Sequence, residues 1–206
     1  MSPPGSSRVL PEAPVQPPLE PRSPTVLVAY ASRHGATEGI AARIADRLAG
    51  AGLGADLRRV EQVRELGAYD AAVFGAPVYD QSWPPEADRF VDLNRDALAA
   101  LPLWLFSVGA FGDTKRLLGP LARREPRRIA EVQEAIGPRE YRVFRGVVRK
   151  HQWPFLSRLL FHLFGGRLGD HREWPVIDAW ADRIAAALIA VARRAEDEPP
   201  PESRAS

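Results

Sequence analysis

The segment Thr25-Val-Leu-Val-Ala-Tyr-Ala31, followed at once by Ser32-Arg-His-Gly-Ala-Thr37, decides the fold of this chain. Its first half is a continuous apolar run without polar alternation, which is typical of a parallel strand buried on both faces. From Gly35 to about Ala49 the apolar residues recur at helical spacing, so a helix follows the turn directly. A buried strand that leads through a short polar turn into a helix indicates an α/β architecture.

Four more apolar segments predict strands, and helical patterns lie between or after them. Strands that alternate with helices at this spacing predict a parallel sheet with helices on both faces, because right-handed crossovers place them there. The predicted strands cover Thr25–Ala31, Ala55–Val60, Asp70–Ala76, Leu101–Gly109 and Tyr141–Val148, and the predicted helices cover Gly35–Ala49, Pro85–Ala100, Leu121–Ile136 and Pro175–Arg194.

Composition indicates one domain with two loose ends. With 206 residues, of which 45% are hydrophobic, the chain can bury one sizeable core. The Pro-rich stretches 1–24 and 196–206 are expected to be disordered tails around a domain over 25–195. Cysteine is absent, which excludes disulfides, thiolate nucleophiles and cysteine-bound metals. The sequence has no signal-peptide pattern and no run of about 18 apolar residues, so we expect a cytoplasmic protein.

Charge is distributed unevenly along the chain. Between Lys115 and Arg172 there are 14 Lys and Arg residues against 5 Asp and Glu residues, although the net charge of the whole chain is only +2. One lobe should therefore be basic, which suits an anionic ligand, an acidic partner or an anionic membrane surface. The alternative is an ordinary solvated Arg-rich face. We expect no nucleic-acid partner.

The turn Ser32–Thr37 predicts an anion site. A helix N-terminus offers unpaired N–H groups and the positive end of the helix dipole, and Ser32 and Thr37 add hydroxyl groups. Other nucleotide motifs are not present: there is no GxxxxGK[ST] sequence, and Gly50-Ala-Gly-Leu-Gly54 follows a helix instead of a strand. A phosphate group is therefore the expected ligand of this turn.

The turn resembles the flavodoxin phosphate loop, of general form Ser/Thr-x-Thr-Gly-x-Thr. The chain is more closely similar to the flavodoxin-like, menaquinone-dependent protoporphyrinogen IX dehydrogenases. These share a Thr-Arg-Asp-Gly-Gln-Thr-type loop, an Ile-Gly-Ala-Ser-type turn after the third strand, and an aromatic, basic insertion that ends in Gly-Gly. The matching segments here are Ser32–Thr37, Phe74–Pro77 and Trp153–Gly166. His34 and Ala36 depart from that loop, and Ser107–Thr114 departs from the subfamily.

The resemblance implies a flavodoxin-like, doubly wound five-stranded parallel sheet, in the order 2-1-3-4-5, that binds FMN. Ligands of such sheets bind at the carboxyl ends of the strands, so the turns after the first, third and fourth strands should meet there. Tyr79, Trp83 and Phe111 are the aromatic residues available to stack on the flavin, and packing within the loops is the alternative for each. The predicted cofactor-binding residues are Ser32, Arg33, His34, Gly35, Ala36, Thr37, Ala76, Pro77, Val78, Tyr79, Ser107, Val108, Gly109, Ala110, Phe111 and Gly112.

Neither a catalytic acid–base pair nor a metal site is predicted. Flavin N5 itself accepts hydride, so the chemistry does not require such a pair. His151, His162 and His171 lack the spacing of a metal site, and His34 is either a solvent-exposed turn residue or an electrostatic neighbour of the cofactor.

The insertion over 149–172 is long for a connection in this fold and carries its own helical pattern. Trp153 to Phe164 would form a wide apolar face with a narrow polar one. Three hypotheses explain it: a lid over the substrate site, a shallow anchor on the inner face of the cell membrane, or a core or homo-oligomer contact. The flanking Arg149, Lys150, Arg167 and Arg172 suit anionic headgroups.

Three functions follow from these patterns. The first is an FMN-dependent oxidoreductase that acts on a hydrophobic, anionic substrate such as a porphyrinogen and passes electrons to a quinone, as the resemblance implies for haem biosynthesis. The second is an electron carrier that shuttles between proteins, against which the sequence pI of about 9.3 counts. The third is a flavodoxin-like binding module without FMN.

Overall fold

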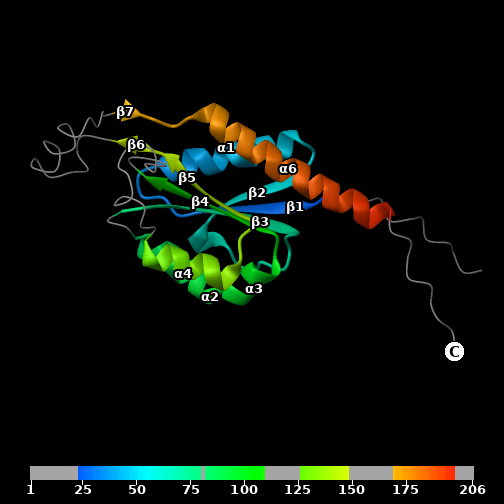
Figure 1. Ribbon diagram of the computed structural model, residues 1–206, viewed down its shortest axis with the longest axis horizontal. Coiled ribbons are helices and arrows are strands. Elements are labelled where there is room, and N and C mark those ends of the chain that lie inside the picture. The colour runs from blue at the N-terminus through cyan, green and yellow to red at the C-terminus, as the bar shows by residue number, and fades with distance from the viewer. Residues whose placement is uncertain (1–22, 80–81, 110–125, 149–168, 198–206) are drawn as a thin grey trace, which may run out of the picture.

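The computed structural model describes residues 23–79, 82–109, 126–148 and 169–197 (Figure 1). The predicted tails therefore fall almost entirely outside the described residues, and so does Trp153–Phe164. In chain order the elements are β1 (Thr25–Tyr30), α1 (Ala36–Gly50), β2 (Gly54–Arg59), the 3-10 turn η1 (Val60–Gln62), β3 (Ala71–Pro77), α2 (Pro85–Leu93), α3 (Arg95–Ala100), β4 (Leu103–Gly109), α4 (Arg127–Ile136), β5 (Glu140–Arg145), β6 (Val147–Val148), β7 (Gly169–Asp170) and α6 (Trp174–Asp197).

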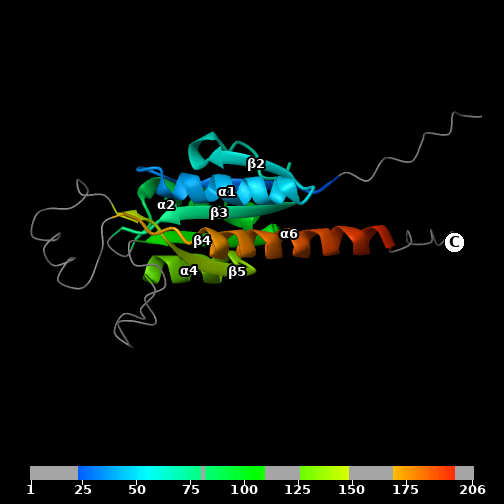
Figure 2. The same cartoon turned by 90° about the horizontal axis from the view of Figure 1, so that it is seen from above.

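The main sheet has five parallel strands in the order β2-β1-β3-β4-β5, which confirms the predicted topology. Helices α1 and α6 cover one face, and α2, α3 and α4 cover the other (Figures 1 and 2). Every residue of β3 is buried, as are five of the six residues of β1, because both strands lie between two helical layers. The continuous apolar runs of the sequence thus correspond to the central strands.

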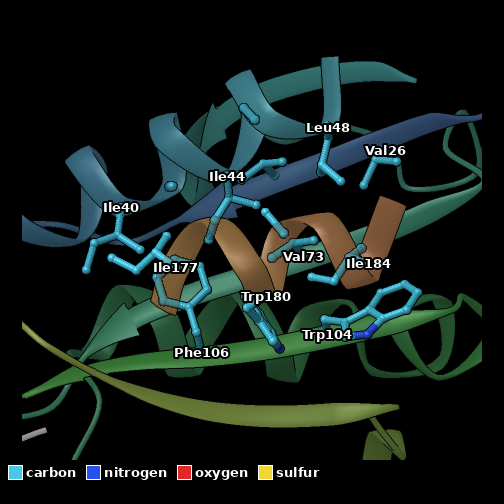
Figure 3. Close-up of a cluster of buried hydrophobic side chains, with 14 of the residues drawn as sticks. Val26, Ile40, Ile44, Leu48, Val73, Trp104, Phe106, Ile177, Trp180 and Ile184 are labelled. Carbon is cyan, nitrogen blue, oxygen red and sulfur yellow. The ribbon is translucent and has the colours of Figure 1, made fainter. Parts of the chain in front are cut away.

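Two apolar cores, one on each face of the sheet, hold the layers together. Between the sheet and the α1/α6 layer, Phe106 packs on Trp180, with ring centroids 6.1 Å apart (Figure 3). The ring of Phe144 packs on Trp180 as well, with centroids 5.4 Å apart. On the opposite face Phe74 contacts Trp83 and Phe90 at 5.4 and 5.3 Å. Because each core forms from both strands and helices, the sheet cannot shift without disrupting both.

The segment Phe74–Pro77, matched to a turn after the third strand, belongs to strand β3, which ends one residue beyond the predicted strand Asp70–Ala76. Pro77 is tolerated there because β1 no longer pairs with β3 beyond Gly75. The N–H of Val78 donates to the carbonyl of Val108 on β4. Because successive backbone nitrogens of a strand point to opposite sides, the nitrogen of Pro77 points toward β1. Proline has no N–H to donate, so no hydrogen bond to β1 is lost there.

Three other predicted elements differ in extent. The helix predicted over 85–100 is divided into α2 and α3 at Asn94, whose side-chain amide donates to the carbonyl of Phe90 (2.8 Å). The strand predicted over 141–148 is interrupted at Gly146. The helix predicted to begin at residue 121 is observed from Arg127, and its first predicted residues lie outside the described ranges.

Strands β6 and β7 form a small antiparallel ribbon, in which Val147 pairs with Asp170 and Val148 with Gly169. The ribbon lies at the end of the molecule where α1 begins and where the parallel strands end (Figure 1). The described residues on either side of 149–168 therefore lie side by side in this ribbon. Within the described ranges, no helix has the length and apolar character needed to cross a membrane.

Candidate functional site

The turn between β1 and α1 has the geometry of an anion-binding loop. Gly35 has a φ of 81°, in the left-handed region, and the side-chain oxygen of Ser32 accepts a hydrogen bond from its N–H at 3.0 Å. The carbonyl of Gly35 in turn accepts from the N–H of Gly39 (3.0 Å), which closes the first turn of α1. Gly35 is exposed, and a Cβ there would meet nothing within 4 Å. The loop is thus tightly bonded on its inner side and open on its outer side.

The N-terminus of α1 has no side-chain cap. Helix geometry leaves the N–H groups of Ala36, Thr37 and Glu38 without an acceptor in the helix. Ser32 and Thr37 are buried, whereas Arg33 and His34 are exposed. The uncapped N–H groups and the positive end of the helix dipole fit a phosphate at this loop.

Two arginines hold the loop in place. Arg59, the last residue of β2, donates from Nη2 to the carbonyl oxygen of Ser32 (3.0 Å). Arg33 makes a forked ion pair with Glu86 in the first turn of α2, with distances of 3.1 and 3.2 Å. This pair lowers the pKa of the Glu86 carboxyl, chiefly through the hydrogen bond from Arg33. The turn Ser32–Thr37 is therefore connected to both β2 and α2.

The segment after β3 meets this loop. Tyr79 and Ser82 exchange two backbone hydrogen bonds (2.9 and 2.8 Å), which close a tight turn. Tyr79 is 41% exposed, and its ring lies edge-on to the ring of His34, with centroids 6.2 Å apart. Ala76 and Pro77 are buried, and Val78 is half-buried. The structure thus brings the predicted residues of the first and third turns together.

The end of β4 completes the same edge of the sheet. Ser107 is fully buried and accepts a hydrogen bond from Nε1 of Trp83 (2.9 Å). Trp83 is itself 3% exposed and packs on Phe74, which supports the structural interpretation of this residue over flavin stacking. Val108 is buried and Gly109 half-buried. Ala110, Phe111 and Gly112 lie outside the described residues.

Sequence reasoning missed Arg59 and Glu86. The parallel register pairs Tyr30 with Arg59, so the strand order already places Arg59 beside the turn that follows β1. The side-chain pair of Arg33 with Glu86 carries no comparable signal, because it depends on the path of the chain between β3 and α2. Among the described residues there is no cluster of His, Cys, Asp and Glu that could bind a metal ion.

Comparisons with known proteins agree with this geometry. A family model described as a flavodoxin domain matches residues 27–171. Among solved structures, a flavodoxin mutant from Pseudomonas aeruginosa is similar over 80% of this chain and 99% of its own, with 19% identity and a TM-score of 0.53. Another similar structure is a flavodoxin from the domain Archaea, with 14% identity, coverage of 80% and 99%, and a TM-score of 0.51.

A third similar structure is the rubredoxin:oxygen oxidoreductase of Desulfovibrio gigas, with 15% identity, 82% of this chain covered and a TM-score of 0.54. This chain spans only 37% of the length of that protein. No curated protein sequence matches the chain. At these identities the structural likeness shows the fold, and the family match extends over most of the sheet and its site.

FMN is the cofactor that the flavodoxin domain indicates. The residues present fit it: the open, uncapped loop at Gly35 can hold the phosphate, and the turn that carries Tyr79 lies beside that loop. These features favour bound FMN over a binding module that lacks the cofactor.

Proposed function

This chain belongs to the flavodoxin family, and we propose that it is an FMN-dependent oxidoreductase that dehydrogenates a hydrophobic, anionic substrate of the porphyrinogen type and passes the electrons to a quinone. When bound, FMN supplies the hydride acceptor. The chain itself supplies the phosphate loop Ser32–Thr37, the exposed ring of Tyr79 and the surface on which the substrate binds. The residues at the end of β4 and directly after it, Ser107 to Gly112, are proposed to contact the flavin.

One observation carries the choice of an enzyme with its own substrate. The ribbon β6–β7 holds both ends of segment 149–168 at the cofactor edge of the sheet. The N–H of Gly146 donates to the carbonyl of Gly109 at the end of β4 (3.0 Å), and the N–H of His171 donates to the carbonyl of Gly146 (3.2 Å). An aromatic, basic segment that begins and ends beside the FMN loops is suited to present a substrate to the flavin.

We assign this role to Trp153–Phe164, which lies outside the described residues. Its apolar residues suit the body of a porphyrinogen or a quinone in a membrane, and the flanking arginines suit carboxylate or phosphate groups. The proposal therefore includes peripheral contact with the inner face of the cell membrane, where quinones reside. Contact between two copies of the chain through the same segment is the competing interpretation.

An electron carrier is the second candidate. It is favoured by the similarity to complete flavodoxin chains, of which the P. aeruginosa and archaeal examples are covered to 99%. The excess of basic residues between Lys115 and Arg172 favours the enzyme, because it provides attraction for an anionic substrate.

Anaerobic turnover distinguishes the two candidates. The FMN-loaded protein is incubated with protoporphyrinogen and a soluble menaquinone analogue, and porphyrin fluorescence is followed with and without the quinone. The enzyme is expected to form porphyrin only when the quinone is present. A protein that exchanges electrons with a protein partner but forms no porphyrin is a carrier.

A variant without the segment tests its role. A short Gly/Ser linker replaces residues 153–164 and joins Gln152 to Gly165. The variant is expected to keep the flavin spectrum and to lose quinone reduction or liposome binding. If it unfolds or releases FMN, the segment is core packing and the case for a hydrophobic redox partner fails.

A further inference from the structure

Arg172, just after β7, contacts several residues, although it is not among the residues predicted to bind the cofactor. Its guanidinium forms a two-pronged ion pair with Asp170, with 2.9 Å from Nε to Oδ1, and its backbone N–H donates to the same oxygen (3.1 Å). The guanidinium also lies over the ring of Trp174 at 4.4 Å. With 19% of its side chain exposed, Arg172 is held from several directions.

Gly39, in the first turn of α1, provides the surface against which Arg172 packs. A Cβ at Gly39 would lie 2.4 Å from Nη1 of Arg172, closer than any normal contact. The guanidinium therefore occupies the space that a side chain would fill. Gly39 also donates its N–H to the carbonyl of Gly35, so the residue that Arg172 contacts is bonded directly to the phosphate loop.

A second contact joins the ribbon to the same place. Gly146, between β5 and β6, lies so close to Val108 that a Cβ would be 2.7 Å from its Cγ1, and that Cβ would also reach the side chain of Ala36 at 4.0 Å. The base of the ribbon thus packs against the end of β4 and lies near the first residue of α1.

We propose that Arg172 is a positioning residue for the FMN phosphate loop: by packing on Gly39 it fixes the first turn of α1 to the ribbon β6–β7, so that the two are energetically coupled. The inference rests on FMN binding at Ser32–Thr37. As a consequence, β6 and β7, the strands on either side of segment 149–168, influence the affinity for the cofactor.

The charge-neutral variant Gly39→Ala provides the main test. Alanine is a better helix former than glycine, so the midpoint of apoprotein unfolding should stay the same or rise. The added methyl group displaces Arg172, and we expect the Kd for FMN, measured by flavin fluorescence, to rise roughly five- to tenfold, as is usual for coupling between contacting residues. The phosphorus resonance of bound FMN should also shift.

Gly50→Ala is the matched control, because Gly50 ends the same helix and a Cβ there would meet nothing within 4 Å. It should leave the Kd at the wild-type value. In an Arg172→Ala background, Gly39→Ala should have no further effect on the Kd, because the residue it displaces is gone. Arg172→Lys keeps the charge but lacks the planar fork, and should weaken FMN binding as well.

Three outcomes are decisive. If wild-type protein fails to bind FMN, both this inference and the proposed function are overturned. If wild type binds FMN but Gly39→Ala and Arg172→Lys bind it equally well, Arg172 acts only as a charge or as a surface residue and the inference alone is overturned. If the effects of Gly39→Ala and Arg172→Ala simply add, the contact between them does not carry the coupling.

Discussion

Glycine is favoured at both position 35 and position 75 of this architecture, but for opposite reasons. Gly35, at the open carboxyl edge of the sheet, has a left-handed φ and nothing within 4 Å of the Cβ position. Gly75, in the middle of the sheet, has no such φ, and a Cβ would lie 2.0 Å from Cζ of Phe106. At the edge, therefore, backbone conformation and free N–H groups decide which residue fits, whereas in the centre of the sheet the volume of the side chain decides.

The largest expected effect is that of Gly75→Ala. The ring of Phe106 faces Gly75 across the β3–β4 pair and cannot move aside, because Phe144 and Trp180 pack against it. Overpacking of this kind typically costs up to about 3 kcal/mol, and we expect the unfolding free energy in urea to fall by roughly that amount. The folded fraction should still bind FMN.

Two further variants sharpen this prediction. Phe106→Leu in the Gly75→Ala background should recover part of the lost stability, because it removes the ring that clashes. Gly67→Ala, at an exposed glycine with nothing within 4 Å of the Cβ position, should change stability by no more than about 0.5 kcal/mol. A loss as large as that at Gly75 would show that volume does not distinguish the two regions.

The second prediction concerns the opposite case, Gly35. Asp and Asn are among the residues that tolerate the left-handed region, and both fit the open space, so Gly35→Asp and Gly35→Asn should fold. A carboxylate about 4 Å from the nearly doubly charged phosphate costs on the order of 2 kcal/mol even in water. We therefore expect Gly35→Asp to bind FMN about thirtyfold more weakly than Gly35→Asn in a fluorescence titration. Equal affinities would place the phosphate elsewhere.

The contrast between centre and edge also explains what the sequence could predict. The central strands were predicted within one or two residues because burial on both faces produces continuous apolar runs, and their order followed from the family resemblance. The strand, turn and helix around Ser32–Thr37 were predicted because their signal is local in sequence, and the binding of a phosphate there stays a prediction. Strand β7, its pairing with Val147–Val148 and the contact of Arg172 with Gly39 could not be predicted, since two-residue strands have no periodicity and the contact joins residues 133 positions apart.

Trp83 provides a third test, because it lies in a loop near the edge but belongs to the core. Trp83→Phe removes the indole donor and leaves the buried hydroxyl of Ser107 without that partner, which should cost about 1 to 2 kcal/mol of unfolding free energy. Combining it with Ser107→Ala should recover much of this loss. In the single variant Trp83→Phe, the Kd for FMN should not change. A tenfold change in Kd would assign Trp83 to the flavin site.

The smallest expected effect is the dependence of stability on acid pH. Apart from Tyr30, the described buried residues carry no ionisable side chain, so the core should contribute nothing between pH 3 and 8. The edge contributes through pairs such as Asp170 with Arg172, whose hydrogen bonds hold the pKa of the Asp170 carboxyl below its ordinary value of 3.8. A carboxyl with a lowered pKa in the folded state stabilises the protein above its unfolded pKa and loses this contribution as the pH falls through the folded one.

Asp170→Asn isolates that contribution. Nearly half of the Asp170 side chain is exposed, so solvent screens the pair and its worth should be no more than about 0.5 kcal/mol. We expect the difference in unfolding free energy between wild type and Asp170→Asn to be constant from pH 5 to 8, to shrink below about pH 4, and to be smaller in 1 M salt. A difference that persists at pH 3 would mean that Asp170 stabilises the ribbon by packing and not by charge, and a difference that grows above pH 5 would assign the acid sensitivity to another group.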